Sequence, residues 1–215
     1  DALGRRISRN SLDGMTTYGY DATGQLTSVV LPSGRRIEYA YDAAGNRLAV
    51  TDGGEVSNYV VDQLGRYTLV GTTEREYDRD GNLVVERTAD GQVTQYSYDD
   101  ESKLIRVSGP DGTTSYEYDP LGNRVASIRD GERTEFLVDP TGLSSVVARY
   151  DASGHVVSHY AHSSFGLIAG FDAGGDAAFY QFDFPGSTTA ITGAGGAILN
   201  EYEYLPYGEI VSETE

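Results

Sequence analysis

The chain has 215 residues, of which 33 are acidic and 16 basic, so its formal net charge is −17, and it contains no cysteine. This excess of negative charge repels phosphate backbones and argues against nucleic-acid binding. Without cysteine the chain can form neither disulfides nor thiolate metal sites. The sequence holds no run of about 18 apolar residues, so we expect no membrane-spanning segment.

From the N-terminus onward the chain repeats one pair, an aromatic residue or valine followed by aspartate, with glycine three residues after the aspartate. The pairs are Tyr20/Asp21, Tyr41/Asp42, Val61/Asp62, Tyr77/Asp78, Tyr98/Asp99, Tyr118/Asp119 and Val138/Asp139. By subtraction, successive aspartates are 21, 20, 16, 21, 20 and 20 residues apart. The matching glycines are Gly24, Gly45, Gly65, Gly81, Gly122 and Gly142, and Ser102 takes this place after Asp99. Such a period predicts a repeat array.

The pattern continues more loosely toward the C-terminus. It runs through Tyr160, Asp183, Gly186 and Tyr204. Because the register is unbroken, we expect a single array without a linker.

The residues that begin with each aspartate predict a type I turn, which favours aspartate first, proline second and glycine fourth. Asp119-Pro120-Leu121-Gly122 and Asp139-Pro140-Thr141-Gly142 meet all three preferences. A second turn about half a period later is predicted at Asp13-Gly14, Ser33-Gly34, Asp52-Gly53, Asp90-Gly91, Asp111-Gly112 and Asp130-Gly131. Asp-Gly between extended segments indicates a tight hairpin turn with positive φ at both central residues.

The segments between these turns have the length of β-strands, for example residues 123–129 and 132–138. Each unit therefore predicts two antiparallel strands and two turns. Tyrosines two residues apart, such as Tyr39 and Tyr41, fall on one face of a sheet, where we expect ladders of neighbouring rings. No segment shows sustained helical periodicity, so we predict an all-β fold of antiparallel β-hairpins.

These motifs resemble the YD-repeat or RHS-repeat family, which includes bacterial RHS polymorphic toxins, the B/C components of Tc toxin complexes, and the teneurins. The resemblance covers essentially the whole chain and is most specific at residues 41–48, 118–124 and 180–209. It implies a curved strip of a spiral β-shell. Residues 1–151 would be YD/RHS repeats, and residues 152–215 look like the start of the RHS-associated core, with looser repeats.

The resemblance also implies a setting. The protein would be a secreted or cell-surface bacterial protein, and its main partner would be the remainder of its own polypeptide, the shell and a C-terminal toxin or effector. The family's aspartyl self-cleavage site lies past the end of this chain, and no residue here matches it. We expect the chain to be a piece of a longer protein.

Few residues suggest other chemistry. His155, His159 and His162 lie within eight residues, but in a strand the first two would share a face and His162 would point to the other, which is poor zinc spacing. Asp151, His155 and nearby serines lack the sequence context of a catalytic triad. The Asp-x-x-Gly motifs match no calcium-loop pattern, and Gly174-Gly175-Asp176 stands alone.

We therefore expect a non-enzymatic structural module without metal or cofactor, the wall of a shell around a toxin or effector. The motif tyrosines, aspartates and glycines named above, Asp183 and Gly186 included, would be its structural residues. The alternative is a cell-surface adhesion module that binds glycans or a partner protein through its tyrosines. Strand edges left open at the termini would also favour self-association.

Overall fold

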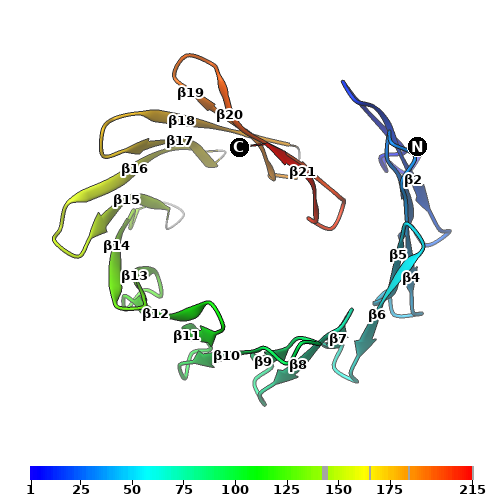
Figure 1. Cartoon of the computed structure of the whole chain (residues 1–215), viewed down its shortest axis with the longest axis horizontal. Coiled ribbons are helices and arrows are strands. Elements are labelled where there is room, and N and C mark those ends of the chain that lie inside the picture. The colour runs from blue at the N-terminus through cyan, green and yellow to red at the C-terminus, as the bar shows by residue number, and fades with distance from the viewer. Residues whose placement is uncertain (142–144, 165, 184, 215) are drawn as a thin grey trace. The chain divides into compact units, whose positions relative to one another are not determined.

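The computed structural model describes residues 1–141, 145–164, 166–183 and 185–214. These residues form 21 β-strands joined by turns, and none of them is helical. The all-β prediction is confirmed (Figure 1). No described helix is long and apolar enough to cross a membrane. The chain divides into two compact units, Asp1–Asp111 and Gly112–Glu215.

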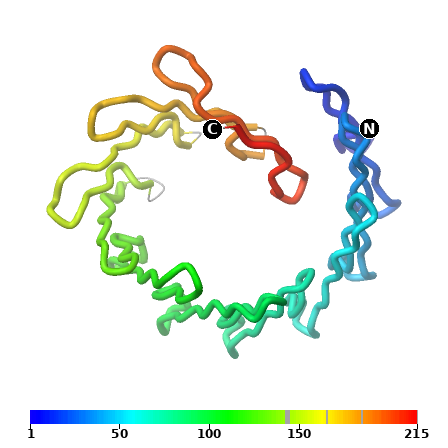
Figure 2. The backbone as a smooth tube through the Cα atoms, in the orientation of Figure 1, coloured from blue at the N-terminus to red at the C-terminus, as the bar shows by residue number. Residues whose placement is uncertain are grey.

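The first unit is a strip of antiparallel strands in which each strand pairs with the next along the chain. Its strands are β1 (Ser8–Ser11), β2 (Gly14–Tyr20), β3 (Leu26–Val30), β4 (Arg36–Tyr41), β5 (Arg47–Asp52), β6 (Glu55–Val61), β7 (Tyr67–Val70), β8 (Thr73–Tyr77), β9 (Leu83–Arg87), β10 (Val93–Tyr98) and β11 (Leu104–Gly109). The tube in Figure 2 shows how consecutive hairpins follow one another along it.

The second unit repeats this arrangement, again with antiparallel pairing between consecutive strands. Its strands are β12 (Gly112–Tyr118), β13 (Arg124–Arg129), β14 (Glu132–Val138), β15 (Val146–Asp151), β16 (Val156–Ser163), β17 (Gly166–Asp172), β18 (Ala177–Phe182), β19 (Thr188–Gly193), β20 (Ile198–Tyr204) and β21 (Ile210–Thr214). The two-strand, two-turn unit predicted from the sequence is therefore present in both parts.

Side chains on one side of the strip, which we call the tyrosine face, form the core of the first unit. Ile37 in β4 is fully buried and pairs with Val29 in β3, while Tyr39, two residues after Ile37, pairs with Val50 in β5. Because alternate residues of a strand share a face, all four lie on the same side.

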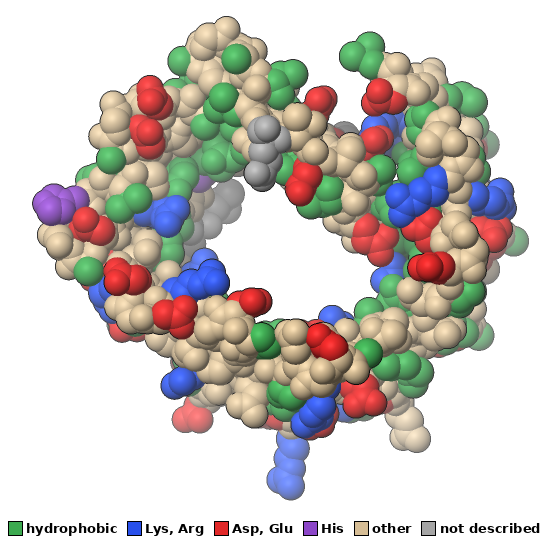
Figure 3. All heavy atoms as spheres, viewed as in Figure 1, with side chains coloured by type: hydrophobic (Ala, Val, Ile, Leu, Met, Phe, Trp, Pro, Cys, Tyr) green, Lys and Arg blue, Asp and Glu red, His purple; other side chains and the backbone are tan. Residues whose placement is uncertain are grey.

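The buried apolar residues of the second unit are Ala126, Ala148, Ala169 and Leu205. Ala126 in β13 is fully buried and pairs with Glu117 and Glu135, whose carboxylates both bind the guanidinium of Arg133. The stem of an arginine can cover apolar surface while its charged head stays in water. Large apolar side chains such as Leu137 remain half exposed. Charged side chains of both signs are interspersed among them on the visible face (Figure 3).

The second set of turns departs from the predicted geometry. Positive φ at both central residues occurs at Asp130 and Gly131, as predicted. At Asp13-Gly14 and Asp111-Gly112 only the glycine has positive φ. These turns are centred one residue earlier, because the glycine already belongs to the following strand.

Two further turns of this set begin earlier than the sequence suggested. Gly34 and Gly91 donate their backbone N–H to the carbonyls of Leu31 and Thr88, both at 2.9 Å. Each of these glycines is thus the fourth residue of a turn, like the glycine after each motif aspartate. At Asp52-Gly53 the following glycine completes the turn, with φ of +57° at Gly53 and +93° at Gly54.

Candidate functional site

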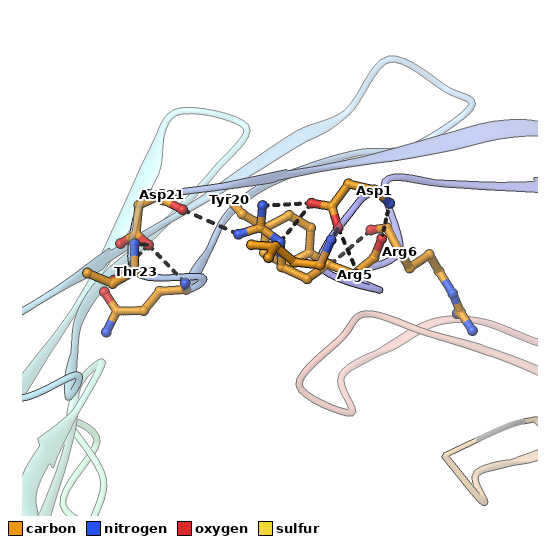
Figure 4. Close-up of polar contacts among 8 residues, drawn as sticks. Asp1, Arg5, Arg6, Tyr20, Asp21 and Thr23 are labelled. Carbon is orange, nitrogen blue, oxygen red and sulfur yellow. Dashed lines mark hydrogen bonds and ion pairs between the residues drawn. The ribbon is translucent and has the colours of Figure 1, made fainter.

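The repeated feature that dominates the structure is the turn after each tyrosine, shown for Asp21 in Figure 4. Oδ1 of Asp21 accepts the backbone N–H groups of Thr23 and Gln25, both at 2.9 Å. The Asp21 N–H donates to the Gln25 carbonyl at 3.0 Å, and the Gly24 N–H donates to the Asp21 carbonyl at 3.2 Å. One aspartate thus closes the turn from both its backbone and its side chain.

The same turn recurs along the chain. Oδ1 of the aspartate accepts the N–H groups two and four residues later at Asp1, Asp42, Asp62, Asp78, Asp99, Asp119 and Asp151. At Asp139 the N–H and hydroxyl of Thr141 bind Oδ1. At Asp183 the N–H groups of Gly186 and Ser187 do so.

The fourth residue after the aspartate closes a second ring, which sequence reasoning missed. The side-chain amides of Asn46, Asn82 and Asn123 donate to Oδ2 of their aspartates at 2.9 to 3.0 Å. Arg66 does the same toward Asp62 through its guanidinium, with an Nε–Oδ2 distance of 2.8 Å. The signal was visible as Asn or Arg directly after the motif glycine.

The motif glycines have positive φ where the structure describes them. Gly24, Gly45, Gly81 and Gly122 have φ between +84° and +93°, and Gly186 has +97°. L-residues with a β-carbon rarely adopt this conformation. Ser102 nevertheless takes φ of +59° in the Asp99 turn, so a serine accepts the strained conformation there. Gly142 lies outside the described residues.

Hydrogen bonds to the carboxylates shift their protonation. The pKa of Asp42 is lowered chiefly by the side-chain amide of Asn46, and then by backbone N–H groups of the turn. The pKa of Asp78 and Asp119 is lowered chiefly by the same kind of amide, and the pKa of Asp21 is lowered chiefly by the hydroxyl of Thr23. Because their oxygens already accept N–H groups, these carboxylates act as turn caps rather than as calcium ligands. No group of three or more metal-ligating side chains occurs within the described ranges.

Four of the motif tyrosines fasten their turns to the preceding repeat. The hydroxyl of Tyr41 donates to the Leu26 carbonyl at 2.7 Å, and that of Tyr98 donates to the Leu83 carbonyl at 2.9 Å. Tyr20 and Tyr77 make the equivalent bonds to the carbonyls of Arg6 and Tyr67. In every case the acceptor lies five residues after the aspartate of the preceding repeat.

One repeat keeps this cross-repeat bond although it has lost the tyrosine. Val61 precedes Asp62, so no hydroxyl stands at the usual place. Tyr67, which follows the turn, instead accepts the backbone N–H of Arg47 at 2.9 Å. Arg47 lies five residues after Asp42, so the contact reaches the equivalent point of the preceding repeat.

Arginines lie next to many of the rings, and the rings of Tyr59 in β6 and Tyr67 in β7 meet edge to face with their centres 5.8 Å apart. The guanidinium carbon of Arg66 lies 5.0 Å from the Tyr77 ring centre, and that of Arg124 lies 5.2 Å from Tyr116 and 5.5 Å from Phe136. Tyrosines of successive repeats stand two strands apart, roughly 10 Å, too far for direct stacking. The arginine fills this gap with a cation–π contact.

Within a strand the pairing of rings is as predicted. Tyr202 and Tyr204 in β20 stack with their centres 6.3 Å apart, and Tyr180 and Phe182 in β18 with centres 6.5 Å apart. Both pairs therefore share a face.

The histidines do not form a site. His155 is not in a strand, contrary to the expectation, but occupies the fourth place after Asp151, where its Nδ1 lies 3.2 Å from Oδ2 of that aspartate. His159 stacks on Phe171 with ring centres 4.7 Å apart. His162 lies near Asp139, whose pKa is lowered chiefly by the backbone N–H and the hydroxyl of Thr141 and in small part by His162. Each histidine thus has a different local role.

Known proteins and one protein family resemble this chain over most of its length. The family described as Teneurin YD-shell matches residues 5–215. The tRNA3(Ser)-specific nuclease WapA of Bacillus spizizenii is 32% identical over 196 residues, a stretch that covers 88% of this chain and 8% of the relative. Teneurin-1 of Homo sapiens is 29% identical over 202 residues, 92% of this chain and 7% of the relative. The chain thus spans less than a tenth of either relative.

A solved structure shares the fold. The crystal structure of TcdB2-TccC3-TEV superposes with a TM-score of 0.50 at 16% identity, over 96% of this chain and 14% of the other. The aspartate turn, the tyrosine that ties it to the preceding repeat, and the match over residues 5–215 lead to one conclusion: this chain belongs to the Teneurin YD-shell family.

Proposed function

We propose that this chain is a non-enzymatic segment of shell wall, part of a YD-repeat enclosure around a C-terminal toxin or effector. The observation that carries the proposal is the hydroxyl bond from four motif tyrosines to the repeats that precede them, as from Tyr41 to Leu26. This bond joins a repeat to the one before it, so a wall can extend by adding such repeats. The side chains of the turn are occupied in holding the wall together.

The relatives support a place in a larger polypeptide. The chain covers 8% of the WapA nuclease and 12% of a protein named double-stranded DNA deaminase toxin A, from Burkholderia cenocepacia. In such proteins most of the chain lies outside the matched segment. We propose the same here, with residues 1–151 as regular wall, residues 152–215 as the approach to a core region, and a secreted or cell-surface bacterial protein as the setting.

Limited proteolysis of the complete polypeptide tests this proposal. An intact enclosure should protect the segment after residue 215 from a protease that cuts the same segment rapidly when it is expressed alone. Substituting Asp42→Ala and Asp119→Ala together should open the wall and speed the cutting, whereas Asp176→Ala, an exposed aspartate, should not. Equal cutting of the enclosed and the free segment would overturn the proposal. Specific glycan binding by the wall would then favour the adhesion alternative.

A further inference from the structure

One repeat is shorter than the others, and the proposed role as a wall does not explain why. Asp62 and Asp78 are 16 residues apart, whereas the other steps are 20 or 21. The structure places the missing residues in the β7–β8 hairpin. Its strands have four and five residues, while the preceding β5 and β6 have six and seven. Strands β6 to β9 lie side by side in the first unit (Figure 1).

The short hairpin leaves part of β6 without a partner on one side. Tyr59 and Val70 form the last pair between β6 and β7, and the Gly71 N–H donates to the Asn58 carbonyl at 2.8 Å just beyond it. Residues 55–57 pair only with β5, and residues 55–58 are all exposed.

The backbone groups of Val56 point into this open space. A two-residue turn joins Asp52 to Glu55, so these two residues form a hydrogen-bonded pair. In an antiparallel ladder the next residue, Val56, turns its N–H and C=O to the other side. That side has no strand at this level, and the Val56 side chain is 56% exposed. We call residues 55–57 the open edge of β6.

The surface beside the open edge has room for a ligand. A hollow next to it is lined by Val56, Ser57, Asn58, Tyr59, Val70 and Thr73. A second hollow on the far side of the short hairpin shares Val70 and Thr73 with the first. Because β6 and β9 are three strand spacings apart, roughly 14 Å, the gap beyond the hairpin tip accepts added strands at ordinary spacing.

The charges around the gap determine which kind of ligand is favoured. Nearby ion pairs, Arg75–Glu86 and Arg87–Glu76, neutralise themselves. Glu55 on the open edge and Glu74 at the start of β8 are exposed and form no ion pair with any residue of the described first unit. The rim is therefore negative, which opposes anionic ligands such as phosphate backbones and favours cationic ones.

We propose that the open edge of β6 binds an extended basic peptide, which adds to the sheet as a strand. Backbone hydrogen bonds to Val56 would supply affinity, and lysine or arginine side chains on the face of the sheet that carries Glu55 would supply selectivity. This assigns an interaction surface to the wall in addition to its enclosing role. It does not depend on whether the wall surrounds a cargo.

Fluorescence anisotropy with a labelled peptide tests the site. The probe is a peptide of about eight residues that alternates lysine and threonine, and its twin carries glutamate in place of lysine. The parent chain should bind the basic probe and not the acidic twin. Absence of binding of the basic probe, or equal binding of both, would overturn the proposal.

Variants of the chain distinguish binding at the open edge from non-specific binding. Val56→Pro removes the N–H that faces the gap and leaves the β5 ladder intact, so binding should weaken by about tenfold or more. Val56→Ala, the matched control, keeps the N–H and should bind within about twofold of the parent. Adding four residues between Gly71 and Thr72 restores a step of 20 and should fill the gap and abolish binding. Unchanged binding by the lengthened chain would contradict the site even if Val56→Pro fails to fold.

Discussion

The carboxylate of each motif aspartate accepts N–H groups of its turn, which would otherwise hydrogen-bond to water. In the Asp119 turn, Oδ1 accepts the N–H groups of Leu121 and Asn123, and Oδ2 accepts the Asn123 amide. Asp119→Ala removes all three acceptors, so we expect Tm to fall by about 2–4 °C, the range for losing one local cap in a chain of this size. Thermal unfolding followed by circular dichroism measures the change. Asp176→Ala is the control, and an equal Tm for both variants would refute this role of the carboxylate.

Acid should weaken the same turns. Hydrogen bonds hold the pKa of Asp42, Asp78 and Asp119 below the value of a free carboxyl. A folded pKa below the unfolded one gives stability that is present above the unfolded pKa, about 3.9, and is lost as the pH falls through it toward the folded value.

The comparison that isolates this effect uses Asp42→Asn. Relief of the −17 net charge by acid opposes the loss in every variant, so the difference between chains is the informative quantity. Between pH 6 and pH 3, limits chosen to bracket about 3.9, the parent should lose more Tm than Asp42→Asn. A parent that loses less would contradict the assignment.

The motif glycines should resist substitution. Gly45 has φ of +91°, and a β-carbon there would lie 3.1 Å from Nε2 of Gln25. Gly45→Ala should therefore destabilise the chain by about 1 kcal/mol or more. Gly195→Ala, at a position without positive φ and with open space around it, should cost less. Urea unfolding compares the two, and equal midpoints would count against the strained turn.

At the scale of the element, the hydroxyl of a motif tyrosine hydrogen-bonds its hairpin to the preceding repeat. Tyr41→Phe keeps the ring but removes the hydroxyl that donates to the Leu26 carbonyl, and should cost about 0.5–1.5 kcal/mol, the usual worth of one such bond. Tyr18→Phe is a matched control, because the Tyr18 hydroxyl bonds no other described residue. If both variants unfold at the same urea concentration, the hydroxyl does not fasten the repeats.

The sequence predicted the local parts of these elements well. Asp-x-x-Gly determines its turn through neighbouring atoms, so the turn from Asp119 to Gly122 followed from the residues alone. The contacts of Tyr41 with Leu26 and of Arg66 with Tyr77 could not be predicted in this way. They join different repeats and depend on the register between strands.

The pairing register contains β-bulges, which cannot be predicted from the alternation of side chains between the two faces of a strand. The pairing shifts between Gly19 and Tyr20, and again between Ala40 and Tyr41, directly before the aspartate. Such a bulge leaves one residue unpaired and re-aims the following side chain. The shift brings the tyrosine hydroxyl toward the preceding repeat, which explains why strand periodicity alone missed the contact.

For the whole molecule, the exposed apolar side chains predict association. Leu137, Val157 and Phe179 are 38% to 50% exposed, and we expect chains to pair through such surfaces and through strand edges. Salt should favour the process by screening the −17 charge. Light scattering over a concentration and salt series measures it. A species that stays monomeric at every concentration and salt level would refute the prediction.

Hydrogen exchange tests the central claim, that aspartate turns tied to the preceding repeat hold the wall together. The amides of Gln25, Asn46 and Asn123 face a carboxylate and should exchange slowly at neutral pH. In Asp42→Ala the Asn46 amide should exchange faster while Asn123 stays protected. Fast exchange at all three positions in the parent chain would show that the turns are not closed by their aspartates, and would contradict the account.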